Sequence, residues 1–257
     1  MAFALPWGRR AVREEDVAEW AAALADVHAH VLPGVDDGPA TWDEALALCR
    51  DAAARGTRTL VATPHYIPGG PWAVPWPRVR ERAEELQRRV DEAGIPLRVR
   101  PGQELMLDPL LPDHLRDGNA GSLSGGEAAR PGDTVLVELP LTGRPLFLFD
   151  VLHELLIMGL KVLLAHTERY EYLRAEDLEE LARMGVRFQV NAGSFLPGAS
   201  AERRARAWQL LRAGRVAALG SDTHGAHRPP GLDVALRAIL AERQGHTWLD
   251  AMRRAAV

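Results

Sequence analysis

Short, continuous hydrophobic runs alternate with longer amphipathic stretches along most of this 257-residue chain. Runs of this kind are typical of strands that are buried on both faces of a parallel sheet. The longer stretches have apolar residues at i, i+3, i+4 and i+7, which is the spacing of a helix that buries one face. The pattern predicts strands at 26–30, 59–62, 97–100, 135–139, 162–165, 186–190 and 216–219, and helices near 41–56, 76–93, 146–158, 176–184, 201–213 and 232–242.

The strand and helix repeat about seven times in roughly 230 residues, which predicts one α/β barrel, with an open doubly wound sheet as the alternative. Before the first strand, acidic residues at 14–16 are followed by Val17, Trp20 and Leu24. An acidic first turn and an apolar face predict a short amphipathic helix there. Residues 1–24 are therefore interpreted as an N-terminal extension with this helix, and residues 25–257 as the barrel domain.

Composition narrows the classes of protein to consider. Apolar residues make up 47% of the chain, which is enough for a substantial core. The single cysteine, Cys49, excludes an internal disulfide framework, and its spacing from Ala45 and Leu46 predicts a packing role. A formal net charge of −4 provides no global basic field for nucleic acid, so a small or peptide substrate is favoured.

Two features predict a cytoplasmic protein without membrane insertion. In the first ten residues the arginines follow the short apolar run, which is the reverse of a secretory signal. The longest apolar stretch, residues 151–165, is interrupted by His153, Glu154 and Lys161 and is too short to span a bilayer.

The candidate chemistry begins at His28 and His30, which lie one residue apart in the first predicted strand. Side chains at i and i+2 of a strand point to the same face, so both imidazoles can reach one metal ion. Other polar residues also fall at the carboxyl ends of predicted strands, the face where α/β barrels build their sites. Together the candidates are His28, His30, His65, Glu104, Glu138, His166, Asp222 and His224, with Asp37 on the loop after the first strand.

So many titratable groups at one end of a barrel would each need a partner if they were buried, and shared cations are the simplest one. Imidazole and carboxylate ligands without thiolates suit Mn²⁺, Zn²⁺ or Fe. The candidates are too many for one ion and suit two or three. Three divalent ions carry about +6 against four carboxylates, and the remaining charge of about +2 favours an anion such as phosphate.

Two arginines follow candidate ligands closely. Arg169 lies three residues beyond His166, and Arg228 lies four beyond His224. A guanidinium group can hold phosphate oxygens in bidentate fashion. The chain has 31 Lys and Arg residues, most of them expected to be solvated, so position alone singles these two out. Catalytic roles are predicted for Arg169 and Arg228.

Several segments around these residues have the character of motifs: DVHAH at 26–30, GVDDGP at 34–39, GTRTLVATPH at 56–65, AHTERY at 165–170, QVN at 189–191 and SDTH at 221–224. They resemble the PHP (polymerase and histidinol phosphatase) superfamily. Within it they are most similar to the bacterial tyrosine-protein phosphatases of capsule and exopolysaccharide clusters. The resemblance extends from about Asp26 to the C-terminus, and the residues before Asp26 extend beyond the family's usual start.

This resemblance implies a distorted (β/α)7 barrel with two to three divalent ions, Mn²⁺ being preferred and Fe or Zn²⁺ the alternatives. It implies that a metal-bridging hydroxide attacks phosphorus in line while the metals and the two arginines stabilise the phosphoryl oxygens. By matched position, His28, His30, Glu104 and Asp222 would hold one ion, Glu104, Glu138 and His166 a second, and Asp37, His65 and His224 a third.

The function implied is hydrolysis of phosphotyrosine in proteins, with a bacterial tyrosine autokinase of capsule or exopolysaccharide synthesis as the partner. A small-molecule phosphatase of the histidinol-phosphate type is the alternative on the same fold. An amidohydrolase barrel also begins with His-x-His, but it typically bridges its metals with a lysine, whereas Glu104 and Glu138 stand at the strand ends here. A non-catalytic metal-dependent regulator is the remaining alternative.

The segment at 66–76 departs from the rest of the resemblance because it is rich in proline and tryptophan. It fits two interpretations. Its indoles form an aromatic rim for a tyrosyl ring, or they pack within a stiff loop.

Overall fold

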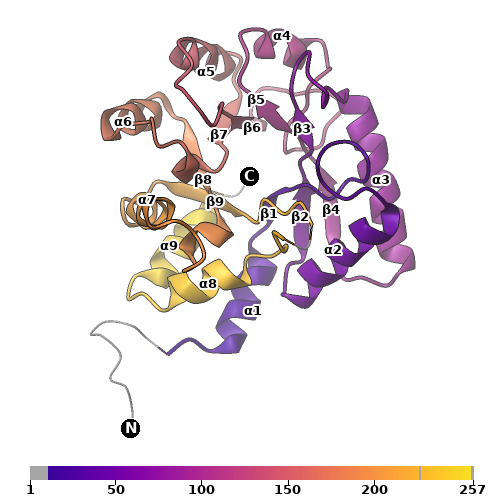
Figure 1. Ribbon diagram of the computed structural model, residues 1–257, viewed down its shortest axis with the longest axis vertical. Helices are drawn as coiled ribbons and strands as arrows, with labels where there is room; N and C mark the ends of the chain where they lie inside the picture. Colours follow the sequence, from indigo (N-terminus) through magenta and orange to yellow (C-terminus); the bar gives the residue numbers. More distant parts are fainter. Residues whose placement is uncertain (1–10, 226, 256–257) are drawn as a thin grey trace.

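Two parallel sheets form the centre of the protein, and helices surround them (Figure 1). The computed structural model describes residues 11–225 and 227–255, so the predictions for the first ten residues lie outside the described residues. The first sheet has the order β1-β2-β4 and the second the order β3-β5-β6-β7-β8-β9. The strands are β1 (Asp26–Ala29), β2 (Thr59–Ala62), β3 (His65–Tyr66), β4 (Arg98–Pro101), β5 (Glu104–Met106), β6 (Thr134–Glu138), β7 (Lys161–Leu164), β8 (Arg187–Asn191) and β9 (Val216–Gly220).

The helices lie where the hydrophobic pattern predicts them, with two additions, α4 and α9. The N-terminus of α2 is a capping box, in which Thr41 accepts a hydrogen bond from the Glu44 amide and the Glu44 carboxylate accepts one from the Thr41 amide. The sequence did not predict α9, which begins at Gly245. A residue with a Cβ would not fit at this position, because the Cβ would lie 2.2 Å from the Ile239 carbonyl oxygen. The helices are α1 (Glu14–Ala23), α2 (Trp42–Ala54), α3 (Trp76–Glu92), α4 (Leu111–Arg116), α5 (Leu148–Ile157), α6 (Ala175–Met184), α7 (Ala201–Arg212), α8 (Asp233–Leu240) and α9 (Gly245–Arg254), with short 3₁₀ turns η1 (Thr167–Arg169) and η2 (Ala192–Phe195).

The two sheets meet where strands break. Thr63 and Pro64 separate β2 from β3, and Gly102 and Gln103 separate β4 from β5. Pro64 has no amide to donate to a ladder, and a Cβ on Gly102 would lie 2.7 Å from Val61 Cγ1. Backbone hydrogen bonds still cross the breaks, from the Thr63 amide to the Ala29 carbonyl and from the Gly102 amide to the Ala62 carbonyl.

Because of these breaks, the structure confirms only part of the predicted α/β barrel. The parallel α/β class is confirmed, whereas a closed barrel is not, because the described strands form two separate sheets rather than one closed sheet. At the other edge, β1 meets the segment that follows β9 through an isolated bridge between Ala29 and Thr223, and the Asp222 amide donates to the His28 carbonyl. The consequence for the site is that β1 and β9 end side by side.

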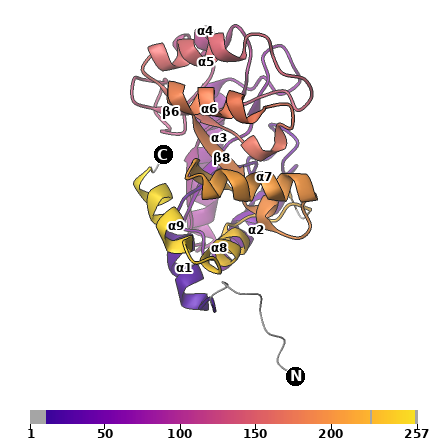
Figure 2. The same ribbon diagram turned by 90° about the vertical axis from the view of Figure 1, so that its left-hand side faces the viewer.

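Helix α1 lies against α8 and α9 at one end of the molecule (Figures 1 and 2). Its apolar face buries Val17 and Trp20, as its predicted amphipathic character requires. At its N-terminus, Glu14 forms an ion pair with Arg237 of α8. These contacts join α1 to the main core, and the boundary proposed at residue 24 stays a prediction.

Most of the interior is apolar, although Asp26 and Glu168 are also fully buried. Cys49 is buried in α2, as its predicted packing role requires, and burial raises the pKa of its thiol to about 12. Trp76 is also buried, and its indole Nε1 donates to the Gly126 carbonyl at 2.8 Å. No helix within the described residues is long and apolar enough to cross a membrane.

Candidate metal centre

All nine predicted ligands lie together in one cluster, and seven of them lie late in a strand or beyond its carboxyl end. His65 and Glu104 are instead the first residues of β3 and β5, directly after the breaks that follow β2 and β4. The parallel pairing places these ends at the same edge, so residues far apart in sequence become neighbours. Eight of the nine are buried or nearly so, and the exception is Asp37, whose side chain is 42% exposed. His28 lies in β1, with His30 and Asp37 beyond its end; His65 is in β3, Glu104 in β5 and Glu138 in β6; His166 follows β7, and Asp222 and His224 follow β9.

Glu104 is the centre of this cluster. Its Oε2 atom lies 3.2 Å from His28 Nε2, 3.3 Å from His30 Nε2 and 3.0 Å from His65 Nδ1. Its other oxygen, Oε1, lies 2.9 Å from His166 Nε2. One carboxylate therefore contacts four imidazoles, which is an arrangement suited to bridging two cations.

Further carboxylates border the cluster on both sides. Glu138 lies 3.5 Å from His65 Nδ1 and 3.4 Å from His166 Nε2. On the exposed side, Asp37 Oδ1 lies 3.2 Å from His224 Nε2 and 3.6 Å from His65 Nε2.

Three overlapping groups have ligand atoms close enough to share an ion, with all atoms of a group within 4.8 Å of one another. Compared with the predicted division, Asp37, His65 and His224 stay together, and His30 joins them. The histidine grouped with Glu104 and Glu138 is His65, whereas the prediction was His166. His166 nevertheless contacts both carboxylates. The groups are His30, Asp37, His65 and His224; His28, His30 and Asp222; and His65, Glu104 and Glu138.

Asp36 and Gln189 hold the histidines in place, and neither was predicted to have this role. Asp36 Oδ2 lies 2.6 Å from His30 Nδ1 and accepts a hydrogen bond from the His65 amide at 3.1 Å. Gln189 Oε1 lies 3.1 Å from His28 Nδ1 and accepts from the His166 amide at 2.7 Å. These contacts fix which ring nitrogen faces the centre. The available signal was the position of both residues inside motifs, at 34–39 and 189–191.

The same neighbours shift the protonation of the histidines. Burial lowers the pKa of His65, but the nearby carboxylates of Glu104 and Glu138 outweigh it and raise the pKa to about 11. By the same balance the pKa of His166 rises to about 10, and that of His30, beside the carboxylates of Asp36 and Glu104, to about 9. Burial raises the pKa of Glu104, but the charge of His28 and a hydrogen bond from His166 outweigh it and hold this pKa well below its ordinary value.

The donor set fits divalent cations. Glu104 Oε2 and His65 Nδ1 are buried without a hydrogen bond of good geometry, although each has close polar neighbours. His28 Nε2 and His30 Nε2 also face each other at 3.1 Å. Buried polar atoms that converge without satisfying one another are costly unless a ligand completes them. Oxygen and imidazole donors at these separations are what a cluster of divalent ions requires.

Two residues of the cluster occupy a backbone conformation that glycine normally takes. His166 has φ of 25° and Asp222 has φ of 53°. Positive φ strains a residue with a Cβ and persists where the surroundings enforce it, often at functional sites. At both positions the turn after the strand directs a ligand side chain into the cluster.

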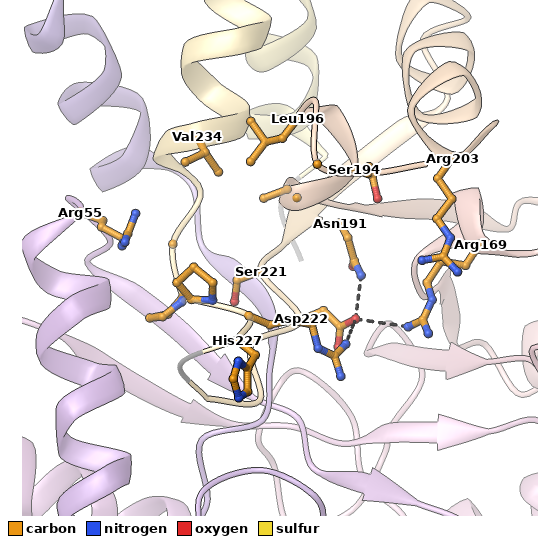
Figure 3. Close-up of a pocket in the computed structure, with 18 residues that line it drawn as sticks. Arg55, Arg169, Asn191, Ser194, Leu196, Arg203, Ser221, Asp222, His227 and Val234 are labelled. Atoms are coloured by element: carbon orange, nitrogen blue, oxygen red, sulfur yellow. Dashed lines mark hydrogen bonds and ion pairs between the residues drawn. The ribbon is translucent and has the colours of Figure 1, made fainter. Parts of the chain in front are cut away.

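A cavity of about 580 Å³ lies next to Asp222, and we call it the arginine cavity. Both predicted arginines reach its floor, where Arg228 Nη1 lies 2.9 Å and Arg169 Nη1 lies 3.4 Å from Asp222 Oδ2 (Figure 3). Asn191 Nδ2 donates to the same oxygen at 2.7 Å. The charged and aromatic residues that line the cavity are Arg55, Arg169, Arg203, Asp222, His227 and Arg228.

The proline- and tryptophan-rich segment contributes one indole to the cluster. Trp72 stacks on the His65 imidazole with 5.1 Å between ring centroids and 12° between planes. Trp76, by contrast, is fully buried in the core. The buried Trp76 agrees with the interpretation of packed indoles, whereas an aromatic rim for a tyrosyl ring at Trp72 stays a prediction.

Most of the chain matches the model of a known protein family. The family described as capsular polysaccharide synthesis, CpsB/CapC, matches residues 24–254. This match covers every residue of the cluster and both arginines of the cavity floor.

Individual relatives have related names. The chain is 29% identical over 203 residues to tyrosine-protein phosphatase YwqE of Bacillus subtilis, covering 78% of this chain and 77% of YwqE. It is 27% identical over 232 residues to tyrosine-protein phosphatase CpsB of Streptococcus pneumoniae, covering 86% of this chain and 91% of CpsB. A crystal structure from work on YwqE and CpsB, described as unique metal-dependent tyrosine phosphatases, matches with a TM-score of 0.79 and 26% identity over 91% of this chain and 96% of that one.

Proposed function

This chain belongs to the CpsB/CapC family of capsular polysaccharide synthesis, within the PHP superfamily that its motifs resemble, and we propose that it is a metal-dependent phosphatase acting on phosphotyrosine in proteins. The observation that carries the proposal is the position of Asp222. One of its oxygens faces the histidine cluster and the other faces two arginines. A phosphoryl group in contact with both regions would meet cations on one side and guanidinium donors on the other.

The proposed ligands are the nine clustered residues, which would hold two to three divalent ions, with Mn²⁺ as the preferred metal and Fe or Zn²⁺ as alternatives. When bound, such ions neutralise phosphoryl charge and lower the pKa of water toward neutrality. The supporting observations are the imidazole and carboxylate donors, the absence of thiolates among them, and the separations within each group. The proposed ligands are His28, His30, Asp37, His65, Glu104, Glu138, His166, Asp222 and His224.

Arg169 and Arg228 are the proposed catalytic residues. Their guanidinium groups would donate to the nonbridging phosphoryl oxygens and gain strength as negative charge develops in the transition state. Asp222 holds both arginines beside the cluster before substrate binds. Asn191 shares that carboxylate oxygen and keeps it from turning away from the cavity.

The architecture, the source of the substrate and the location of the protein complete the proposal. The two sheets and their surrounding helices are proposed to form a distorted (β/α)7 barrel, supported by the hydrogen bonds that cross the strand breaks. A bacterial tyrosine kinase is the proposed source of the phosphotyrosine substrate. A cytoplasmic location stays a prediction from the sequence.

Metal analysis combined with a phosphatase assay tests the proposal. We expect two to three divalent ions per chain, hydrolysis of a phosphotyrosine peptide, and loss of activity on treatment with a chelator. His30→Ala should abolish nearly all activity, because His30 belongs to two of the three ligand groups. His114→Ala is a suitable control, because His114 lies in α4 outside these groups. One tightly bound zinc ion and no phosphatase activity would reject the proposal.

The choice of substrate has its own test. Turnover of the phosphotyrosine peptide should greatly exceed turnover of histidinol phosphate under the same metal conditions. A large preference for histidinol phosphate would instead support the small-molecule alternative and leave the metal centre as proposed.

A further inference from the structure

The arginine cavity carries more positive charge than a phosphoryl group on its floor accounts for. Asp222 is the carboxylate among its lining residues, and it already faces Arg169 and Arg228. Directly after α2, Arg55 Nε lies 2.9 Å from Asp51 Oδ1, and its Nη1 lies 3.6 Å from Asp233 Oδ1. Three of the four arginines therefore have acidic partners from this chain.

Arg203 is the fourth arginine and has no acidic partner within the described part of the chain. It lies in the first turn of α7, where its amide donates to Ser200 Oγ, and its guanidinium group forms no hydrogen bond with any residue that the structure describes. Figure 3 shows its side chain extending from the helix into the cavity, on the same side as Arg169. Arg203 thus presents an unpaired positive charge beside the proposed phosphoryl position.

The cavity has room for more than a phosphoryl group. A volume of about 580 Å³ is in the range of sites that enclose a ligand with several groups, roughly 300 to 1,000 Å³. Its wall also includes the apolar side chains of Leu196, Pro230 and Val234. A tyrosyl ring with an adjoining part of the peptide would occupy this space, and an acidic residue there would meet Arg203.

We propose that Arg203 is a specificity-determining residue, which binds the carboxylate of an aspartate or glutamate close to the phosphotyrosine in the protein substrate. This inference rests on the proposed function, since it takes the phosphoryl group to be bound by Arg169 and Arg228. Arg203 acts on substrate choice rather than on the chemical step, because its charge lies away from the Asp222 carboxylate that both catalytic arginines share.

The expected effect is moderate. Arg203 is exposed, and an ion pair in contact with water contributes about 1 kcal/mol or less, which is about fivefold in affinity. A glutamate correctly placed beside the phosphotyrosine should therefore raise kcat/KM about two- to fivefold over glutamine at the same place. The increase should shrink at high ionic strength, since salt screens exposed charges.

Steady-state kinetics on a peptide series test the proposal. The series carries one glutamate at successive positions on either side of the phosphotyrosine, and a parallel series carries glutamine instead. p-Nitrophenyl phosphate serves as a substrate without a peptide. Arg203→Gln removes the charge and keeps a long polar side chain, and Arg212→Gln is the matched control on the same helix, because Arg212 contacts Trp208 and lies outside the cavity.

The wild-type enzyme should prefer one position of glutamate, and Arg203→Gln should remove that preference without changing turnover of the glutamine peptides or of p-nitrophenyl phosphate. Arg212→Gln should keep the preference. Equal kcat/KM for both series in the wild type would overturn the role of Arg203 and leave the phosphatase function intact. An equal loss on all substrates in Arg203→Gln would also overturn it, whereas no hydrolysis of any substrate by the wild type would reject the proposed function itself.

Discussion

Asp222 joins two regions of different character, the metal centre and the arginine cavity. Its Oδ1 atom lies 3.7 Å from both His28 Nε2 and His30 Nε2, and the side chains of both histidines are fully buried. Its Oδ2 atom faces Arg169 and Arg228, whose side chains are 21% and 44% exposed. Charges interact more strongly where water is excluded, so substitutions should cost more in the metal centre than in the cavity.

The largest expected effect is at Glu104, which contacts four imidazoles. Glu104→Gln keeps the shape and removes the charge, so we expect a loss of bound metal and a fall in kcat of about 10³-fold or more. Elemental analysis and p-nitrophenyl phosphate hydrolysis measure the two effects. Glu92→Gln, at the exposed end of α3, is the control and should behave as the wild type. Full metal content and activity in Glu104→Gln would contradict the buried cluster as the metal site.

Substitution of a cavity arginine should separate the two regions. Arg228→Gln should lower kcat/KM by about 10²-fold, because a charged donor to the phosphoryl group is lost. Its metal content should stay that of the wild type, since Arg228 lies on the far side of the Asp222 carboxylate. A parallel loss of metal would mean that the cavity supports the centre rather than binding substrate.

Substitution of a residue that holds a histidine in place should have an intermediate effect on metal binding. Asp36→Asn keeps a hydrogen-bond acceptor at His30 Nδ1 but removes its charge, so metal affinity should fall about 10- to 100-fold. Activity should return when metal is supplied in excess, and a metal titration of activity would show this. Asp43→Asn, on the exposed first turn of α2, provides the control. A loss that excess metal does not restore would assign Asp36 another role.

The last comparison of the two regions concerns pH. In the metal-free chain the pKa values of His30, His166 and His65 are raised to about 9, 10 and 11, so these imidazoles carry protons at pH 7. A cation binds the neutral ring, so apparent metal affinity should rise with pH from 7 toward 9, by about tenfold per pH unit for each proton displaced.

Calorimetric titration in buffers with different ionisation enthalpies counts these protons. His224 should contribute none of them, because burial and the charge of His30 lower its pKa to about 4. In the cavity, by contrast, substrate affinity should not gain from deprotonation of the arginines, which stay charged throughout this range. An affinity independent of pH, with no proton released, would contradict the protonated state of the cluster.

The sequence predicted the elements well because each hydrophobic run and amphipathic stretch is a local property. The strand at 135–139 and the helix near 76–93 were found within one residue at each end as β6 and α3. The two sheets could not be predicted in this way. The sequence pattern predicts strands that end at 62 and 100, before Pro64 and Gly102, and it predicts no strand at 65–66 or 104–106. The short strands β3 and β5 form there because of the strands that lie next to them in the fold.

The same distinction between local and tertiary properties applies to the site: the sequence predicted which residues belong to it, and the tertiary structure decided how they are arranged. The sequence by itself determined that imidazoles and carboxylates fall at strand ends, because alternation and strand length are local. Only the tertiary structure decided that His30 lies with Asp37, that Asp36 and Gln189 fix the rings, and that Arg203 faces the same cavity as Arg169. The physical reason is that these contacts join residues from different strands and helices, and their distances follow from packing of the whole chain.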